Sequence, residues 1–171
     1  MLATRWFRRF KSAKNGATAV EFAMVAPVFL IMVSGIVEYS LYYFKTSHLK
    51  HVLYEASRNI QTGEVQDADD PQAFFQSEYC KDVAFLASCS SISFDVRAFD
   101  SLGDITYPDA VFDADGKPTN FVFQPGNSEQ VTVMRVSTPY RFITPMIADI
   151  FQPDGAPAII VGYSVAKNEP F

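Results

Sequence analysis

The feature that most constrains this chain is an uncharged apolar run near its N-terminus. The run reads FAMVAPVFLIMVSGIV from Phe22 to Val37. Counted from Ala17, it would rise about 31 Å as a helix, which is close to the hydrocarbon thickness of a bilayer. Such a run spans a membrane once, forms a buried core helix, or belongs to a cleaved secretory signal. A signal is disfavoured because its apolar part is usually shorter and ends in an A-x-A-like site, which does not follow the run before Lys45.

The charges on either side of the run predict its orientation. The first sixteen residues hold five bases and no acid, whereas all 19 acidic residues follow Gly16. Only Lys45 and Lys50 come soon after the run, so the positive-inside rule places the N-terminus in the cytoplasm and the body of the chain outside. A body this acidic, in a chain of net charge −5, argues against nucleic acid as a partner, because nucleic-acid binders present basic faces. Four aromatic residues at the outer end fit an interfacial belt or the start of a packed soluble helix: Tyr39, Tyr42, Tyr43 and Phe44.

Several residues in and beside the run need a physical reason. Pro27 removes a backbone donor, which membrane helices tolerate when neighbours or water satisfy the freed carbonyl. Glu21 is an acid inside the apolar segment, and it either snorkels to the cytoplasmic edge, about one turn away, or has a functional partner. Glu38 is either an interfacial acid beside the aromatic residues or an intersubunit contact. The small pair Ser34 and Gly35 either lets another helix approach closely or marks a local bend.

The residues around Gly16 resemble those of a known family. A basic leader, Gly16, and then Glu21 and Phe22 at the start of an apolar helix resemble the type IV prepilin processing site. The wider stretch from Asn15 to Arg58 resembles the TadE-like minor pilins of tight-adherence (Tad or Flp) pili. The closing sequence NEPF and the central cysteine pair are similar to that family as well, more weakly.

The resemblance implies a processing step and a mode of assembly. A membrane-embedded prepilin peptidase would cut between Gly16 and Ala17 and remove the basic leader, residues 1–16. Glu21 would then neutralise the Ala17 ammonium of a neighbouring subunit in one axial register, with Phe22 and Glu38 in the same assembly segment. The implied partners are the prepilin peptidase, the major and other minor pilins, and the inner-membrane pilus assembly platform.

The implied function is that of a minor pilin or pseudopilin in a bacterial pilus that serves adhesion and biofilm formation. Before assembly it would sit in the inner membrane by one span, with its C-terminal domain in the periplasm; afterwards it would either enter the extracellular pilus or stay in the assembly base. The alternative is an uncleaved, single-pass, membrane-anchored periplasmic binding or scaffold protein, which shares every feature except use of the Gly16 site. An enzyme is not expected, since the sequence holds no phosphate-binding glycine loop, G-x-S-x-G elbow or Ser/His/Asp set, and no cofactor is expected either.

The pattern after the run predicts that the helix continues beyond the membrane. No helix breaker occurs between Val37 and Ile60, and Thr62 with Gly63 would stop the helix. The chain therefore divides into a leader at 1–16, a transmembrane helix at 17–44 and a periplasmic domain at 45–171. Five apolar residues of the continued helix recur at spacings of three and four and should pack on a sheet: Leu49, Val52, Leu53, Ala56 and Ile60.

The predicted fold class is α+β: a long N-terminal transmembrane helix continues into an amphipathic helix that packs on a small antiparallel β-sheet. Asp70 as N-cap and Pro71 as first helical residue predict a shorter helix through about Phe85. A short helix follows Thr144 and Pro145, at about 146–151, and residues 101–120 read as a long loop.

Four segments are strand candidates, namely 92–98, 121–123, 130–136 and 158–166. In the first, Ile92, Phe94 and Val96 alternate with polar residues such as Asp95, which predicts one buried and one solvated face. The turn at Pro125-Gly126 predicts that 121–123 and 130–136 pair as a hairpin.

The only two cysteines, Cys80 and Cys89, both lie in the part placed outside the cytoplasm. A disulfide there would stabilise the fold by roughly 2 to 3 kcal/mol in the chain-entropy estimate. Two cysteines without a second pair or a nearby histidine are a poor zinc set, so no metal is expected at them.

Two other patterns raise a metal site and are disfavoured. His48, His51 and Glu55 share a helix face, but their spacing lacks the H-E-x-x-H arrangement. Residues 113–116 resemble the start of a calcium loop, yet Pro118 and Gln124 stand where that loop needs a glycine and an acid, so a turn is the better prediction.

Overall fold

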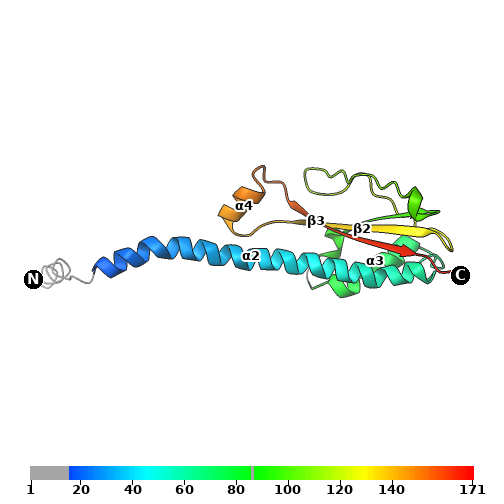
Figure 1. Cartoon of the computed structure of the whole chain (residues 1–171), viewed down its shortest axis with the longest axis horizontal. Coiled ribbons are helices and arrows are strands. Elements are labelled where there is room, and N and C mark those ends of the chain that lie inside the picture. Colours follow the sequence, from blue (N-terminus) through cyan, green and yellow to red (C-terminus); the bar gives the residue numbers. More distant parts are fainter. Residues whose placement is uncertain (1–15, 86) are drawn as a thin grey trace, which may run out of the picture. The chain divides into compact units, whose positions relative to one another are not determined.

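The computed structural model describes residues 16–85 and 87–171; the leader predicted at residues 1–16 lies outside the described residues except for Gly16. The chain forms two compact units, one ending at Tyr39 and the other running from Ser40 to Phe171. The described elements include helices, short 3-10 turns and strands (Figure 1): α2 (Gly16–Gln61), α3 (Pro71–Val83), η1 (Cys89–Ser91), β1 (Ser93–Phe99), η2 (Leu102–Asp104), β2 (Val131–Tyr140), α4 (Pro145–Phe151) and β3 (Ala158–Lys167). The α+β class is confirmed.

The long N-terminal helix is confirmed as one element. Helix α2 runs for 46 residues, with Pro27 inside it. It ends where the sequence predicted, because Gly63 adopts φ 87°, a left-handed conformation that side chains disfavour. A Cβ on Gly63 would lie 2.7 Å from the ring of Phe171, so the C-terminus packs closely over this turn.

The second unit contains a three-stranded antiparallel sheet in the order β1-β2-β3. The face of the sheet that carries Phe94, Val96 and Met134 packs on the amphipathic part of α2 and on α3. All members of the predicted apolar stripe are buried there: Leu49, Val52, Leu53, Ala56 and Ile60. The stripe therefore forms the core against the sheet, as its spacing predicted.

Helix α3 is anchored at both ends. Asp70 caps its N-terminus by accepting a hydrogen bond from the backbone of Ala73 at 3.0 Å. The buried Tyr79 hydroxyl donates to the carbonyl of Leu49 on α2 at 3.0 Å, and burial raises the pKa of Tyr79 above its usual range. The helix ends at Val83, two residues before the predicted end, which is within the ordinary uncertainty of helix ends.

The cysteine pair is bonded. Cys80 lies in the last turn of α3 and Cys89 opens η1, and their Cα atoms are 5.8 Å apart. The disulfide therefore ties the end of α3 to the turn that leads into β1.

Two sequence predictions about the sheet are wrong. The segment 121–123 does not pair with β2 as a hairpin; Phe123 forms a parallel bridge with Val96 of β1 instead. The backbone of Val96 bonds Val122 and Gln124 at 2.8 Å each, so this segment covers the other edge of β1. The second error concerns Asp95, which is fully buried because the long loop covers the face predicted to be solvated.

The loop and the short helix agree with the sequence. The region 101–120 is mostly irregular, and the carboxylate of Asp113 accepts from the backbone of Asp115 and Lys117 at 3.0 and 2.8 Å. Gly116 follows with φ 79°. This local turn is the structure that the sequence favoured over a calcium loop, and α4 forms where the short helix was predicted.

Candidate functional site

The first half of α2 is an apolar helical segment whose side chains are largely exposed. An 18-residue window of this helix has a mean hydropathy of 2.2, and no residue of that window is buried among the described residues. The side chain of Phe22, for example, is 74% exposed. A core helix of a soluble domain would bury this surface, so exposure and length together are compatible with a single-pass membrane anchor.

The predicted processing site lies at the first residues of this helix. Gly16 opens α2, Ala17 follows it, and both are exposed. A Cβ built on Gly16 would meet no atom within 4 Å. The first residues of α2 therefore lie at the surface of the described part of the chain.

Glu21 and Phe22 both expose their side chains on the first turns of α2. Glu21 lies four residues after Ala17, so the two share one helix face. A side chain on a helix leans toward the preceding turn, which directs the Glu21 carboxylate toward the level of Ala17. This geometry suits a contact between the acid and an amine at residue 17.

Glu38 differs from Glu21 in its surroundings. Its side chain is 3% exposed in the structure, whereas Glu21 is exposed. The predicted roles of Glu21, Phe22 and Glu38 in assembly concern contacts with other chains and stay predictions.

The second unit carries an aromatic cluster where it begins. The ring of Tyr42 on α2 lies 5.3 Å from the ring of Tyr140 and 5.9 Å from that of Phe142. Phe142 in turn stacks on Phe151 of α4 at 5.3 Å. These contacts hold α4 beside the start of the second unit, at the end of the sheet where β3 begins (Figure 1).

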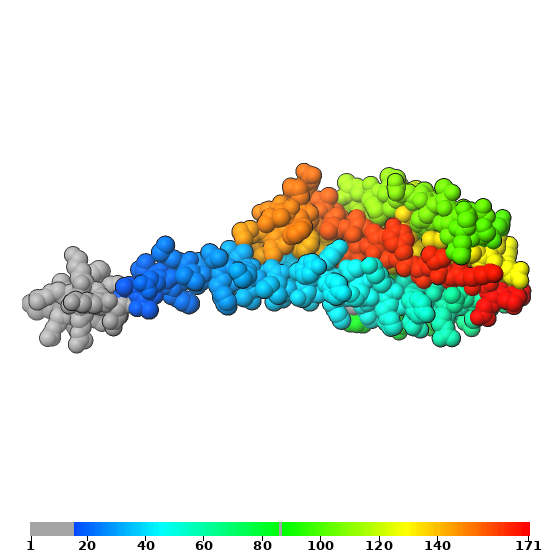
Figure 2. Space-filling view, in the orientation of Figure 1, coloured from blue at the N-terminus to red at the C-terminus, as the bar shows by residue number. Residues whose placement is uncertain are grey.

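Helix α4 presents apolar side chains to the outside. The sequence predicted this helix but gave it no role. In Figure 2, α4 and the turn after it stand out from the surface of the second unit as the orange segment. Its exposed large apolar residues, with the residue that precedes the helix by two positions, are Ile143, Met146, Ile150 and Phe151.

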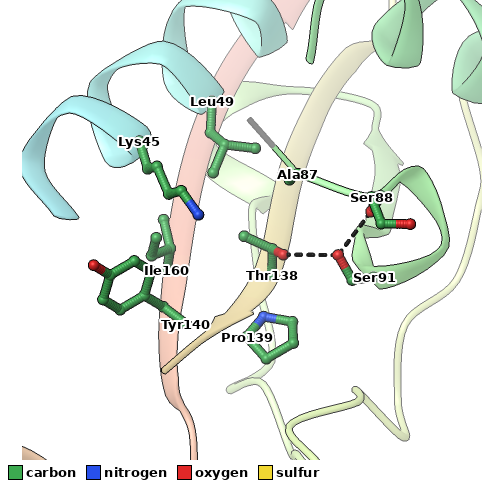
Figure 3. A pocket seen from close by; sticks show the side chains of 9 residues that line it. All are labelled: Lys45, Leu49, Ala87, Ser88, Ser91, Thr138, Pro139, Tyr140 and Ile160. Atoms are coloured by element: carbon green, nitrogen blue, oxygen red, sulfur yellow. Dashed lines mark hydrogen bonds between the residues drawn. The ribbon is translucent and has the colours of Figure 1, made fainter. Parts of the chain in front are cut away.

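A small pocket lies between α2 and the sheet (Figure 3). Its volume is about 210 Å³, and a hydrogen bond of 3.4 Å joins the hydroxyls of Ser91 and Thr138 at its wall. The ammonium of Lys45 lies 5.3 Å from the centre of the Tyr140 ring. The lining holds no acid, histidine or cysteine to act as an acid–base or nucleophilic partner: Lys45, Leu49, Ala87, Ser88, Ser91, Thr138, Pro139, Tyr140 and Ile160.

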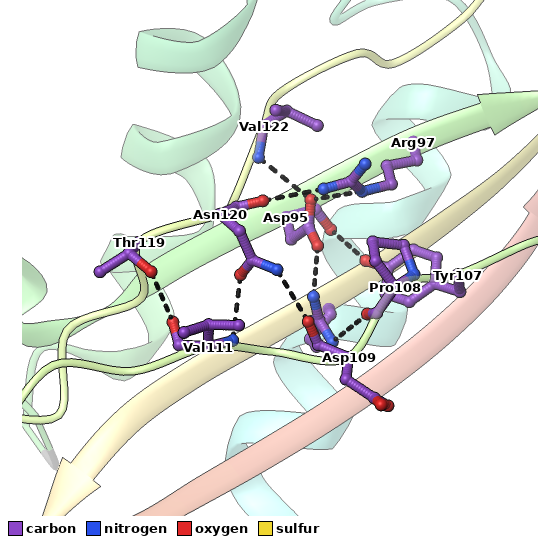
Figure 4. Close-up of polar contacts among 10 residues, drawn as sticks. Asp95, Arg97, Tyr107, Pro108, Asp109, Val111, Thr119, Asn120 and Val122 are labelled. Carbon is purple, nitrogen blue, oxygen red and sulfur yellow. Dashed lines mark hydrogen bonds and ion pairs between the residues drawn. The ribbon is translucent and has the colours of Figure 1, made fainter.

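A buried polar network that the sequence did not predict lies on the outer face of the sheet (Figure 4). The carboxylate of Asp95 binds Arg135 at 2.6 Å and Arg97 at 3.0 Å. It also accepts from the backbone of Val122 at 3.1 Å, and the carbonyl of Asp95 accepts from the Tyr107 hydroxyl at 3.0 Å. The polar residues that alternate on β1 and β2 are visible in the sequence. The residues that they contact are distant in sequence, so alternation alone could not predict the network.

The network fastens the long loop over the sheet. The guanidinium of Arg135 lies between aromatic rings, 4.7 Å from the centre of Tyr107 and 4.6 Å from that of Phe121. Arg135 also donates to the carbonyl of Pro108 at 3.1 Å. Burial, and then the charge of Asp95, raise the pKa of Tyr107, so this hydroxyl stays protonated as a donor. The loop encloses the network, and the contacts of the network hold the loop on the sheet.

His48 is engaged in packing, whereas His51 is exposed. His48 Nε2 lies 3.0 Å from the carbonyl oxygen of Asp82, and its ring contacts Phe44 and Phe85. Within residues 16–85 and 87–171, no group of three or more His, Cys, Asp or Glu side chains is arranged to hold a metal ion. His48, His51 and Glu55 are not brought together as such a group.

Comparison with known proteins matches one part of the chain. The family model described as TadE-like protein matches residues 16–58. This segment is TadE-like. The TadE-like segment begins at Gly16, contains Glu21 and Glu38, and extends through most of the stripe that packs on the sheet. No curated protein and no solved structure matches the chain.

Proposed function

We propose that this protein is a TadE-like minor pilin or pseudopilin that acts in the assembly of a tight-adherence pilus. One observation carries the proposal: the TadE-like match covers a helix whose first half is bare and apolar and whose second half is the core of a folded domain. A helix of this kind holds a domain in a membrane and can later pack among other such helices. Its chemistry is assembly, which is a structural role and not an enzymatic one.

The proposed precursor crosses the inner membrane once. The five bases before Gly16 hold the N-terminus in the cytoplasm, and the domain from residue 45 lies in the periplasm. A secretory signal cut at the outer end of the apolar run would divide α2, whose continuation supplies core residues such as Leu53. Continuity of the helix therefore favours retention of the apolar run in the mature protein.

A prepilin peptidase then cuts between Gly16 and Ala17. The cut removes all five leader charges and leaves one ammonium on Ala17, so the helix loses the basic anchor that resists its extraction toward the outside. Gly16 is exposed, and a Cβ there would meet no side chain of the described residues within 4 Å, which supports access of a protease to this bond.

Glu21 sets the register of the assembled helices. In a filament or an assembly complex, its carboxylate meets the amine of a neighbouring pilin. Other axial offsets leave a charge unpaired in low dielectric, at a cost of several kcal/mol.

The partners follow from this role: the prepilin peptidase, the major and other minor pilins, and the inner-membrane assembly platform. Mature protein leaves the membrane in the pilus, where it contributes to adhesion and biofilm formation. An uncleaved membrane-anchored scaffold shares the same helix, so the experiment must separate the two functions.

The test is complementation of cells that lack the protein. We expect these cells to lose most surface pili, counted by electron microscopy, and wild-type protein to restore them. A Gly16→Val variant should fail to restore them because it blocks processing, although no atom of the described chain contacts this position. Normal piliation without the protein, or full rescue by Gly16→Val, would overturn the proposal.

A matched glycine substitution controls for this experiment. Gly103 lies in η2, and a Cβ there would meet only the Ser101 hydroxyl, at 3.7 Å. A Gly103→Val variant should therefore restore piliation as the wild type does.

A further inference from the structure

We propose that the exposed apolar face of α4 rests on the outer surface of the lipid bilayer, as a second membrane contact beside the transmembrane helix. The inference rests on the proposed membrane span of α2 and adds a lipid-binding surface that lies more than a hundred residues further along the chain. Its occupant is the headgroup and upper acyl-chain region of the lipids.

The second unit begins close to the outer end of the apolar run. The apolar run ends at Val37, and Tyr42 follows five residues later in the same helix. Five residues rise about 7.5 Å, whereas the headgroup layer on each side of the hydrocarbon is about 5 to 8 Å thick. Tyr42 therefore lies at headgroup depth, and a tilt of the helix would bring it closer to the hydrocarbon.

Helix α4 is connected to Tyr42 through aromatic ring contacts. The rings of Tyr42 and Phe142 are 5.9 Å apart, and those of Phe142 and Phe151 are 5.3 Å apart. The opposite end of the sheet adjoins the end of α2, where the backbone of Glu169 donates to Gln61 at 2.8 Å. Along the axis of α2, α4 therefore lies at the membrane end of the domain.

The surface of α4 has an apolar side and a polar side. Met146 and Ile150 are separated by one helical turn and share a face, and Ile150 is 67% exposed. Asp149 lies about 100° around the helix from Ile150 and supplies a polar side. A short helix with one apolar and one polar side, placed at headgroup depth, matches an interfacial membrane contact.

The shape and position of α4 favour lipid over protein as the occupant of its apolar face. Helix α4 projects from the surface of the second unit (Figure 2), and Met146, Ile150 and Phe151 on it are exposed. Tyr43 and Phe44 at the start of the second unit are exposed as well. Aromatic and aliphatic side chains at this depth are typical of residues that anchor proteins at the bilayer surface.

The test measures how close α4 lies to lipid in the full chain. The only tryptophan, Trp6, is replaced by Phe, and Ile150→Trp adds a fluorescent probe on α4. The protein is reconstituted in phosphatidylethanolamine–phosphatidylglycerol vesicles whose acyl chains are brominated near the glycerol in both leaflets. We expect bromination to reduce the Ile150→Trp emission about twofold, because bromine quenches tryptophan only at short range.

Two further probes make the result specific. Leu102→Trp is the matched control: Leu102 is 70% exposed and lies just beyond β1, at the end of the sheet near Gln61, so its emission should not change. Val28→Trp lies in the middle of the apolar run, and it should be quenched in vesicles brominated near the ends of the acyl chains if α2 spans the bilayer. Equal thermal unfolding of the three variants shows that the probes leave the fold intact.

The outcomes separate this inference from the proposed function. If Val28→Trp is quenched but Ile150→Trp is quenched no more than Leu102→Trp, the α4 contact is wrong and the membrane span stands. If Val28→Trp is not quenched, the span and the α4 contact both fail. A blue shift of Ile150→Trp that grows with protein density, without quenching, would mean that another chain covers α4, which would also overturn the inference.

Discussion

At the scale of single residues, Asp95 decides whether the outer face of the sheet is closed. Its carboxylate is the counter-charge of the buried Arg135, and its other contacts hold Arg97 and the loop backbone. We predict that Asp95→Asn lowers the free energy of unfolding by about 3 to 5 kcal/mol, because it leaves Arg135 buried without a counter-charge. Urea unfolding of the full chain in detergent measures the change.

The control for that substitution is another aspartate of the same domain. Asp154 is exposed in the turn after α4, so Asp154→Asn should change the free energy of unfolding by less than about 0.5 kcal/mol. Equal urea midpoints for the two variants would mean that the Asp95 network does not stabilise the fold.

The role proposed for Glu21 is also at the scale of one residue, but it concerns assembly. We predict that Glu21→Ala leaves processing after Gly16 largely intact and lowers the amount of protein in sheared pili by more than about tenfold, since an unpaired charge in low dielectric costs several kcal/mol. Immunoblots of membrane and pilus fractions measure both effects. Glu21→Asp keeps the charge and should retain part of the incorporation, whereas normal incorporation of Glu21→Ala would contradict a register role.

At the scale of elements, the two halves of α2 have opposite surroundings. Its first half exposes apolar side chains, and its second half buries Leu53 completely against α3 and the sheet. We predict that Leu53→Ala lowers the free energy of unfolding by about 2 to 5 kcal/mol, the usual cost of a cavity in a core. The adjacent Tyr54 is 64% exposed, so Tyr54→Ala should cost less than about 1 kcal/mol. Urea unfolding that ranks Tyr54→Ala above Leu53→Ala would contradict this packing.

The elements that the sequence predicted well carry local signals. The length and apolar content of α2, the stop at Gly63 and the N-cap of α3 at Asp70 depend on neighbours within a few residues. The stripe that begins at Leu49 could be predicted because helical spacing alone places its members on one face.

The errors concern contacts between distant segments. The turn at Gly126 suggested a local hairpin, but Phe123 reaches Val96 in parallel, a pairing that no turn signal encodes. Asp95 was predicted to face solvent because the alternation of polar and apolar residues describes one strand alone. It carries no information about the loop that covers that strand. The exposed face of α4 was missed for the same reason, since exposure of Ile150 is a property of the folded domain.

At the scale of the whole molecule, the described residues form two compact units that share one helix. The first unit offers an apolar surface to lipid or to other helices, and the second offers a domain closed by a disulfide and a buried ion network. The TadE-like match covers residues 16–58 of α2 and ends before α3. The domain beyond residue 58 therefore lies outside the part of the chain that the match describes.

The central claim is that the apolar helix becomes an assembly element only after the leader is removed at Gly16. The most direct measurement is the mass of the N-terminal peptide of the protein isolated from native envelopes and from sheared pili. A mature chain that begins at Ala17 in both fractions is the predicted result. A chain that still begins at Met1 in envelopes and is missing from pili would contradict the claim and would favour an uncleaved membrane anchor.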